Sequence, residues 1–189
     1  MSLIKNYIED ENIVVSDFET LEGVEFVECH FKGQDFLGES LANTKFIECT
    51  FEKCNLSNCS TTGASFRDAK FNESKLLGLN FTTCNNLSDL SFDHCLMDLC
   101  IFQALKLKAT RFHECSLKGA DFSDADLGKT DFTRCNLENT LFNGADLREA
   151  DLREAANYFI EPAWTKIKGA RFSMPEAMTL FKGLGIIVD

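Results

Sequence analysis

The hydrophobic positions of this chain recur with a period of five residues. Between residues 107 and 152 an apolar residue falls at every fifth position without a break, and a small residue usually precedes it by two positions. The series comprises Leu107, Phe112, Leu117, Phe122, Leu127, Phe132, Leu137, Phe142, Leu147 and Leu152. A helix repeats its inward face about every 3.6 residues and a strand at every second residue, so neither can bury this pattern. The pattern predicts a solenoid, whose short repeats bury their apolar residues by stacking on one another.

Two runs within this stretch carry a family resemblance. Ala120–Asp124 reads ADFSD and Ala145–Glu149 reads ADLRE, and both resemble the A(D/N)(L/F)xx unit of pentapeptide repeat proteins. The resemblance covers roughly Val24 to Ala155. It implies an all-β solenoid, a right-handed quadrilateral parallel β-helix of roughly six to seven coils at ~4.8 Å per coil. Each coil would hold four pentapeptides, with the central Phe or Leu (position i) and the small residue (i−2) pointing inward.

The chain is expected to form a single domain with a cap at each end. Residues 1–23 form the predicted N-terminal cap, because they lose the period and residues 1–22 set six acids against one base. Residues 24–155 form the predicted β-helix. Within them Gln34 and Glu39 occupy inward i−2 positions, so the first coil should be splayed open or bonded to the cap. Residues 156–189 form the predicted C-terminal cap and dimerisation segment.

A short α-helix is predicted in the C-terminal segment. Ser173, Pro175 and Glu176 read as an N-cap, an early proline and a capping-box glutamate. The tail resembles the C-terminal helix of the gyrase-protecting members of the family, the Qnr, MfpA and McbG proteins, where it caps the coil and joins two subunits. This resemblance implies a homodimer, and a cap without dimerisation is the alternative. The predicted dimer interface consists of Met178, Phe181 and Leu184.

The register of the repeat changes once. The first register runs from Phe26 to Phe81, and the centres then shift by one residue within positions 82–86. We expect a bulge or widened turn there and a bend in the rod, with a binding feature as the alternative. If residues of successive coils stack, one column is entirely aromatic. This predicted core ladder consists of Phe31, Phe51, Phe71, Phe92, Phe112 and Phe132.

The sequence contains few candidates for catalytic or metal-binding residues. Eight of its nine cysteines fall at i−2, and Cys84 does too if the first register continues past Phe81. At i−2 they replace alanine as small buried residues. The sequence has no CxxC pair that could hold zinc. His30, His94 and His113 map to the outside of the all-Phe face. Solvated histidines are favoured there, and a weak metal or proton site at His94 and His113, on successive coils, is the alternative. Nucleotide-binding, zinc-protease and hydrolase motifs are missing, so we expect no catalytic residues, no cofactor and no metal.

Surface charge is the main functional clue. Nineteen Lys and Arg oppose 30 Asp and Glu, which gives a net charge of −11 and disfavours nucleic acids and anionic membranes as partners. The N-terminal residues carry no secretory or membrane-spanning pattern, which predicts a cytoplasmic protein. Two surfaces are candidates for partner binding. The first is an acidic column of Glu28, Glu48, Asp68 and Asp89, and the second is an apolar contact strip of Leu37, Leu77, Leu96 and Leu99.

Two functions follow from these surfaces. The resemblance implies a DNA mimic that occupies the DNA-binding groove of a type II topoisomerase (DNA gyrase or topoisomerase IV) and protects it from quinolones or peptide toxins. The chain lacks the long loop insertions of Qnr members, as MfpA-like members also do. The alternative is a structural or scaffolding repeat protein that binds another protein through the apolar strip. The partner and the drug or toxin stay open at this point.

Overall fold

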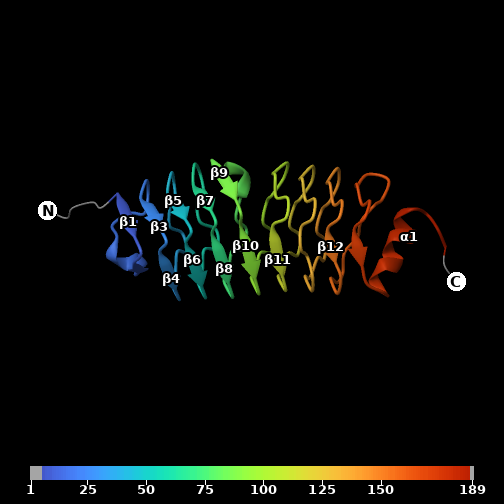
Figure 1. The fold of residues 1–189 in the computed structure, drawn as a ribbon, viewed down its shortest axis with the longest axis horizontal. Coiled ribbons are helices and arrows are strands. Elements are labelled where there is room, and N and C mark those ends of the chain that lie inside the picture. The colour runs from blue at the N-terminus through green and yellow to red at the C-terminus, as the bar shows by residue number, and fades with distance from the viewer. Residues whose placement is uncertain (1–5, 188–189) are drawn as a thin grey trace.

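The computed structural model describes residues 6–187 and is a parallel β-solenoid of about eight turns with one short C-terminal helix. The coils stack into a rod, with β1 (Tyr7–Glu9) at one end and α1 (Thr179–Gly183) at the other (Figure 1). This confirms the predicted all-β solenoid. No helix in the described part of the chain is long and apolar enough to span a membrane.

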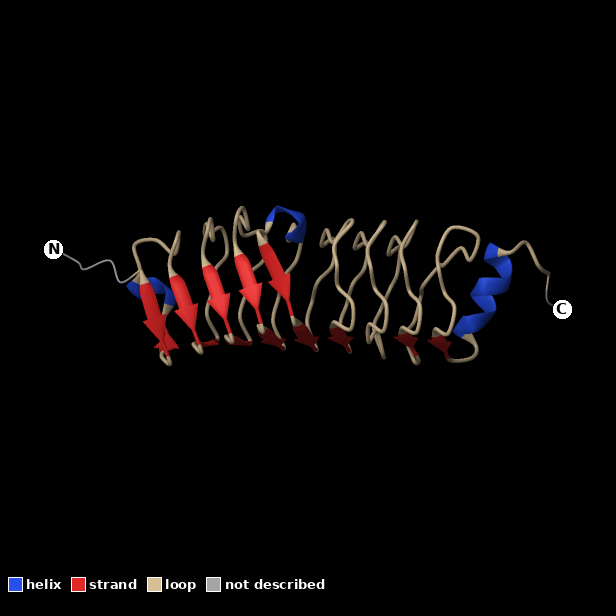
Figure 2. Cartoon of the chain, turned by 45° about the horizontal axis from the view of Figure 1, so that its top comes forward, coloured by secondary structure: helices blue, strands red, loops and turns tan. Residues whose placement is uncertain are grey.

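Two sides of the rod are parallel sheets whose short strands come from successive coils (Figure 2). The five-stranded sheet consists of β1, β3 (Glu25–Val27), β5 (Lys45–Ile47), β7 (Ser65–Arg67) and β9 (Asn86–Ser88). The six-stranded sheet consists of β2 (Asn12–Ile13), β4 (His30–Lys32), β6 (Thr50–Glu52), β8 (Lys70–Asn72), β10 (Ser91–Asp93) and β11 (Arg111–His113). A further pair is β12 (Asp151–Leu152) with β13 (Arg171–Phe172).

The other two sides are held by single parallel bridges between turns. One column links Asp35, Asn55, Lys75 and Leu96, and the other links Asn80, Ile101 and Asp121. Four columns of backbone pairing therefore give the coil four sides. The remaining elements are the 3₁₀ turns η1 (Val15–Asp17), η2 (Phe81–Thr83) and η3 (Glu176–Met178).

The core is built from the centres of the repeats, nearly all of which are buried, whereas Leu87 is half-buried. In the all-Phe column, successive ring centroids lie 4.6 to 5.2 Å apart and the rings are nearly parallel. The members are Phe31, Phe51, Phe71, Phe92, Phe112 and Phe132. A second stack, Phe81, Phe102, Phe122 and Phe142, meets the first edge-on. Stacked and edge-on contacts together add to the stabilisation from burial.

The solenoid extends beyond both predicted boundaries of the repeat. Ile8 pairs with Phe26 in the sheet of β1 and β3, so the predicted N-terminal cap contains a coil of its own. At the other end Leu152 pairs with Phe172. The prediction of six to seven coils was therefore too low. The sequence did not reveal the end coils because the period is broken there. At the N-terminus the spacing is irregular, and at the C-terminus Asn157 and Pro162 occupy the positions at which the period would place Phe or Leu.

The register slip is absorbed by η2. Before it, paired residues are 20 apart, as in Lys45 and Ser65, and across it they are 21 apart, as in Ser65 and Asn86. The Asn80 side chain accepts hydrogen bonds from the backbone N–H and the hydroxyl of Thr82, at 3.0 and 2.6 Å, and so fixes the turn. The row of coils continues straight through this region (Figures 1 and 2). The predicted bend is wrong, because the added residue is accommodated at a corner.

Thiol and hydroxyl groups at i−2 donate hydrogen bonds to backbone carbonyls inside the coil. The thiols of Cys59 and Cys100 donate to the carbonyls of Phe36 and Leu76, both at 2.9 Å, and Thr residues at equivalent positions donate in the same way. Cysteine at i−2 is thus more than a substitute for alanine. Gln34, also at i−2, accepts a hydrogen bond from the Val15 N–H at 2.9 Å, which ties the first coil to the preceding segment. Glu39, by contrast, is exposed.

The cysteines should be unreactive in the folded protein. All nine are free and all but Cys84 are buried. Burial raises the pKa of Cys49, Cys59 and Cys100 to about 12 and that of Cys84 to about 11, so almost no thiolate exists at pH 8. We expect a chromogenic disulfide reagent at pH 8 to titrate Cys84 slowly and the others only after denaturation. Cys84→Ser should remove the native reaction, and rapid labelling of several thiols without denaturant would contradict the structure.

The C-terminal tail forms a short 3₁₀ and α-helical segment, η3 followed by α1. The predicted capping box does not form, because the Ser173 hydroxyl accepts a hydrogen bond from the Glu154 N–H at 3.2 Å instead of capping the helix. Gly185 has a φ of +69° just after the last turn. This conformation, which glycine adopts without strain, ends the helix.

Candidate protein-binding surface

The acidic column lies along one corner of the rod. Glu28, Glu48, Asp68 and Asp89 all have a left-handed backbone, with φ between 52 and 56°. The N–H of each of the first three donates to a carbonyl of the next coil, at 2.8 to 3.0 Å. The four side chains therefore project from equivalent places in successive coils. Asp10, with a φ of 50°, extends the column by one coil. Sequence reasoning missed Asp10 because the period does not hold there.

The acidic column borders a shallow groove on the outside of the rod. Four of its acids, Asp10, Glu28, Glu48 and Asp68, line this groove with His30, Thr50 and Lys70. The last three come from one column of the six-stranded sheet, in which His30 pairs with Thr50 and Thr50 with Lys70. Lys70 supplies the only cationic side chain among these lining residues apart from the titratable His30. The groove therefore has a negative potential.

Several acids elsewhere on the rod form an ion pair with a base one coil away. Such pairs include Lys32 with Glu52 at 3.0 Å and Lys53 with Glu73 at 3.6 Å. Further along the rod, Lys118 pairs with Glu138 and Lys129 with Glu149, both at 3.5 Å. Within residues 6–187, the acidic column makes one ion pair, between Asp68 and Arg67 at 4.0 Å. Its charges are thus largely uncompensated, and their field extends into solvent.

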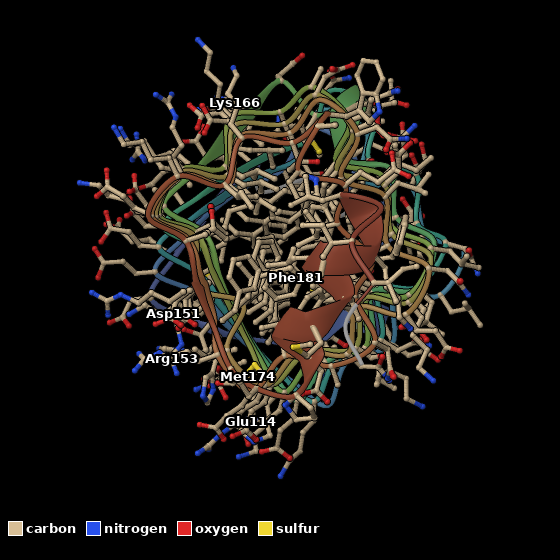
Figure 3. The ribbon with its side chains drawn as sticks, turned by 90° about the vertical axis from the view of Figure 1, so that its right-hand side faces the viewer. Glu114, Asp151, Arg153, Lys166, Met174 and Phe181 are labelled. Carbon is tan, nitrogen blue, oxygen red and sulfur yellow. The ribbon has the colours of Figure 1, made fainter. Side chains whose placement is uncertain are left out.

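The excess of acids over bases lies mainly in the N-terminal half of the rod. The same two columns continue into a second groove that Arg111, Lys129, Glu149, Asp151 and Arg171 help to line. Acids and bases alternate there, and Arg153 forms an ion pair with Asp151 at 2.6 Å. Figure 3 labels both residues on the same side of the rod. The net charge of −11 is therefore distributed unevenly along the molecule.

The structure does not unite the predicted apolar strip. Leu37 and Leu77 point outward from the same column, but Ser57 lies between them. Leu96 belongs to a neighbouring bridge column, and Leu99 sits at a corner, where it would contact a Cβ added at Gly119. Leu37, Leu96 and Leu99 are exposed, while Leu77 is half-buried. The four leucines therefore come from three positions of the coil, and they are unequally exposed.

The larger apolar surface lies at the C-terminal end. There α1 crosses the end of the last coil, with Phe181 near the centre of the end-on view and Met174 below it (Figure 3). Of the predicted dimer residues, Phe181 is 40% and Leu184 is 53% exposed, whereas Met178 is half-buried. Sequence reasoning did not include the exposed Met174 or Ile187 in this surface.

Comparisons with known proteins agree with this architecture. A family model described as "Pentapeptide repeat region" matches residues 81–152, and one described as "Pentapeptide repeats (8 copies)" matches residues 25–60 and 49–85. No curated protein sequence matches significantly.

Similar solved structures include two trypsin-treated variants of QnrB1, a plasmid-mediated fluoroquinolone resistance protein. They share 19% and 18% identity with this chain, with TM-scores of 0.56 and 0.52, and cover 97% of it and 97% and 98% of their own lengths. HetL, a heterocyst differentiation protein from the cyanobacterium Nostoc, shares 18% identity at a TM-score of 0.32, over 90% of this chain and 87% of its own. Together with the five-residue period and the four-sided coil, the two family matches establish that this chain belongs to the pentapeptide repeat family.

Proposed function

We propose that this protein is a DNA mimic that binds a type II topoisomerase, DNA gyrase or topoisomerase IV, and protects it from quinolones or peptide toxins. The observation that carries the proposal is the acidic column, whose charges lack the lysine partners found for other acids on the rod. An uncompensated negative column fits a basic groove built for DNA. The likeness of the fold to QnrB1, described as a fluoroquinolone resistance protein, supports this choice of partner.

The proposed mimicry is one of overall shape and field. Eight turns at ~4.8 Å give a rod of coils about 38 Å long. The acidic residues repeat at this ~4.8 Å spacing, whereas phosphates of one DNA strand repeat at ~3.4 Å. The column therefore cannot match individual phosphates one by one. Binding would depend on the summed potential of the column across a wet interface, and should weaken with salt.

The proposal includes a two-fold dimer formed through the C-terminal ends. The exposed side chains of Phe181, Leu184 and Met174 form an apolar surface at that end, and an isologous contact would cover the same surface on both copies. Two coaxial rods would extend over about 75 Å of coils. Their acidic halves would then face outward at the two ends of a two-fold object, as a two-fold enzyme requires.

Phe181→Asp should convert this dimer to monomers, because a carboxylate would be desolvated at the centre of the contact. Leu37→Asp is the matched control. It introduces the same charge at an exposed side chain on the side of the rod and should leave the dimer intact. Sedimentation equilibrium at micromolar concentration measures the oligomeric state of the wild type and of the two variants. A wild-type protein that is already monomeric there would refute the dimer.

The functional test is DNA supercoiling by purified gyrase with and without the protein. We expect the protein to inhibit supercoiling at high concentration and to reduce quinolone-induced DNA cleavage at lower concentration. Supercoiling and quinolone-induced cleavage that are the same with and without the protein, at every concentration, would contradict the proposal. The scaffolding function would then take its place, although the scattered positions of Leu37, Leu77, Leu96 and Leu99 give it little support.

A further inference from the structure

Two of the three histidines meet two carboxylates on adjacent coils. Asp93 ends β10 and His113 ends β11, and the parallel register of these strands places the two residues side by side. His94 follows at the corner, with a φ of 52°. One ligand atom from each of Asp93, His94 and His113 lies within 4.8 Å of the other two. The one-residue spacing of Asp93 and His94 and the parallel register together build this cluster.

The Nδ1 atoms of both imidazoles face the same carboxylate. His94 Nδ1 contacts Asp93 Oδ1, and His113 Nδ1 lies 3.4 Å from Asp93 Oδ2. His113 Nδ1 is buried and has no hydrogen-bond partner in the described part of the chain. Two ligand atoms on one tetrahedral zinc ion, each at about 2.0–2.2 Å from it, are separated by about 3.4 Å. The His113–Asp93 separation matches this value, and a bound cation would satisfy the unpartnered nitrogen.

Glu114 faces the opposite nitrogens of both rings. His94 Nε2 lies 2.6 Å from Glu114 Oε2, and His113 Nε2 lies 3.8 Å from Glu114 Oε1. Arg134 in turn holds Glu114 with a hydrogen bond of 2.8 Å. Metal-binding histidines typically donate their other ring N–H to a carboxylate, which fixes the tautomer and the orientation of the ring. This second layer is therefore already in place for His94, and the same carboxylate lies near His113.

The electrostatic environment favours a positive charge between the rings. The His94 ring lies between two carboxylates, with Asp93 at Nδ1 and Glu114 at Nε2. Arg111 already binds Asp93 Oδ2 at 2.9 Å, so a cation would share that carboxylate. Imidazole ligands select zinc, nickel or copper over calcium and magnesium, which prefer oxygen.

We propose that Asp93, His94 and His113 bind a divalent transition-metal cation of the zinc class, with Glu114 positioning both imidazoles. The site contains no residue of the acidic column or of α1, and it does not depend on the proposed topoisomerase binding. Water would complete the coordination on the exposed side of His94, whose side chain is half exposed. The spacing of the coils thus creates a metal site from an otherwise structural surface.

The test is a zinc titration of the reduced, chelator-treated full chain against a chromophoric zinc indicator at pH 7.5. We expect one Zn²⁺ per chain, no competition from Mg²⁺, and at least tenfold weaker binding after His94→Asn with His113→Asn. His30→Asn is the matched control, because His30 is an exposed histidine of the same sheet without this cluster. It should bind zinc as wild type does.

Cobalt absorption and folding provide the second readout. Co²⁺ should give visible d–d bands in the wild type and in His30→Asn, but not in the double variant. All proteins should have the same thermal unfolding midpoint without metal, since the substituted rings lie outside the core. Failure of the wild type to bind zinc at 100 µM, or unchanged zinc binding by a folded double variant, would overturn the proposal.

Discussion

Replacing Glu28, Glu48, Asp68 and Asp89 together by lysine is expected to abolish competition with DNA for gyrase. Each charge at a solvated interface contributes little alone, typically below about 1 kcal/mol. Four reversals in one column change attraction into repulsion along the whole column, so we expect a loss of affinity of at least about 100-fold, or roughly 2.7 kcal/mol. The single reversals should each have a much smaller effect. Gel-based displacement of labelled duplex DNA from gyrase measures these affinities.

The quadruple variant should keep its fold. Lys53 and Lys129 already occupy left-handed corners, with φ of 54 and 63°, so lysine is compatible with this backbone conformation. The matched control replaces four exposed acids outside the column, Asp17, Glu19, Glu22 and Glu39, by lysine. It changes the net charge by the same amount at the same end of the rod. If both variants lose competition equally, net charge is responsible, and if neither does, the acidic column is only a solvated face.

Phe112→Ala is expected to destabilise the protein by about 3–5 kcal/mol through the cavity it leaves. The Phe112 ring is fully buried and stacks on Phe92 and Phe132 at 5.1 and 5.2 Å. It also meets Phe102 and Phe122 edge-on, both at 5.6 Å. Alanine would remove all four ring contacts in the middle of the rod. Urea unfolding followed by circular dichroism measures the change in unfolding free energy.

Two controls separate the ring's packing from the substitution itself. Phe159→Ala removes a ring that is 55% exposed, and should change the unfolding free energy by less than about 0.5 kcal/mol. Phe112→Leu should cost far less than Phe112→Ala, since Leu117 and Leu127 fill the equivalent centres of neighbouring columns. A Phe112→Ala change below about 1 kcal/mol would show that the inward register is wrong.

The core of this fold could be predicted because its period is a direct consequence of the coil. The five-residue period indicates a solenoid, and the resemblance to pentapeptide repeat proteins implies four repeats per coil, from which the column of Phe112 and Phe132 follows. The end coils could not be predicted in the same way. Ile8 pairs with Phe26 across 18 residues instead of 20, and irregular spacing of this kind is visible only when the backbone pairs are known.

The functional surface could be predicted only in part. The four acids of the column follow from the register, whereas Asp10 belongs to the irregular first coil. The apolar strip stays a prediction, because its four leucines come from three different positions of the coil and the sequence alone does not show whether their side chains meet. The pairing of His94 and His113 with Asp93 depends on side-chain directions at a corner, which the period does not determine.

The most direct test of the proposed function is displacement of labelled duplex DNA from purified gyrase by the wild-type protein, titrated from about 50 to about 300 mM salt. We expect displacement at low salt, with an apparent affinity that falls steadily as screening weakens the field of the acidic column. If the wild-type protein displaces no DNA even at the lowest salt, the proposed DNA mimicry is contradicted.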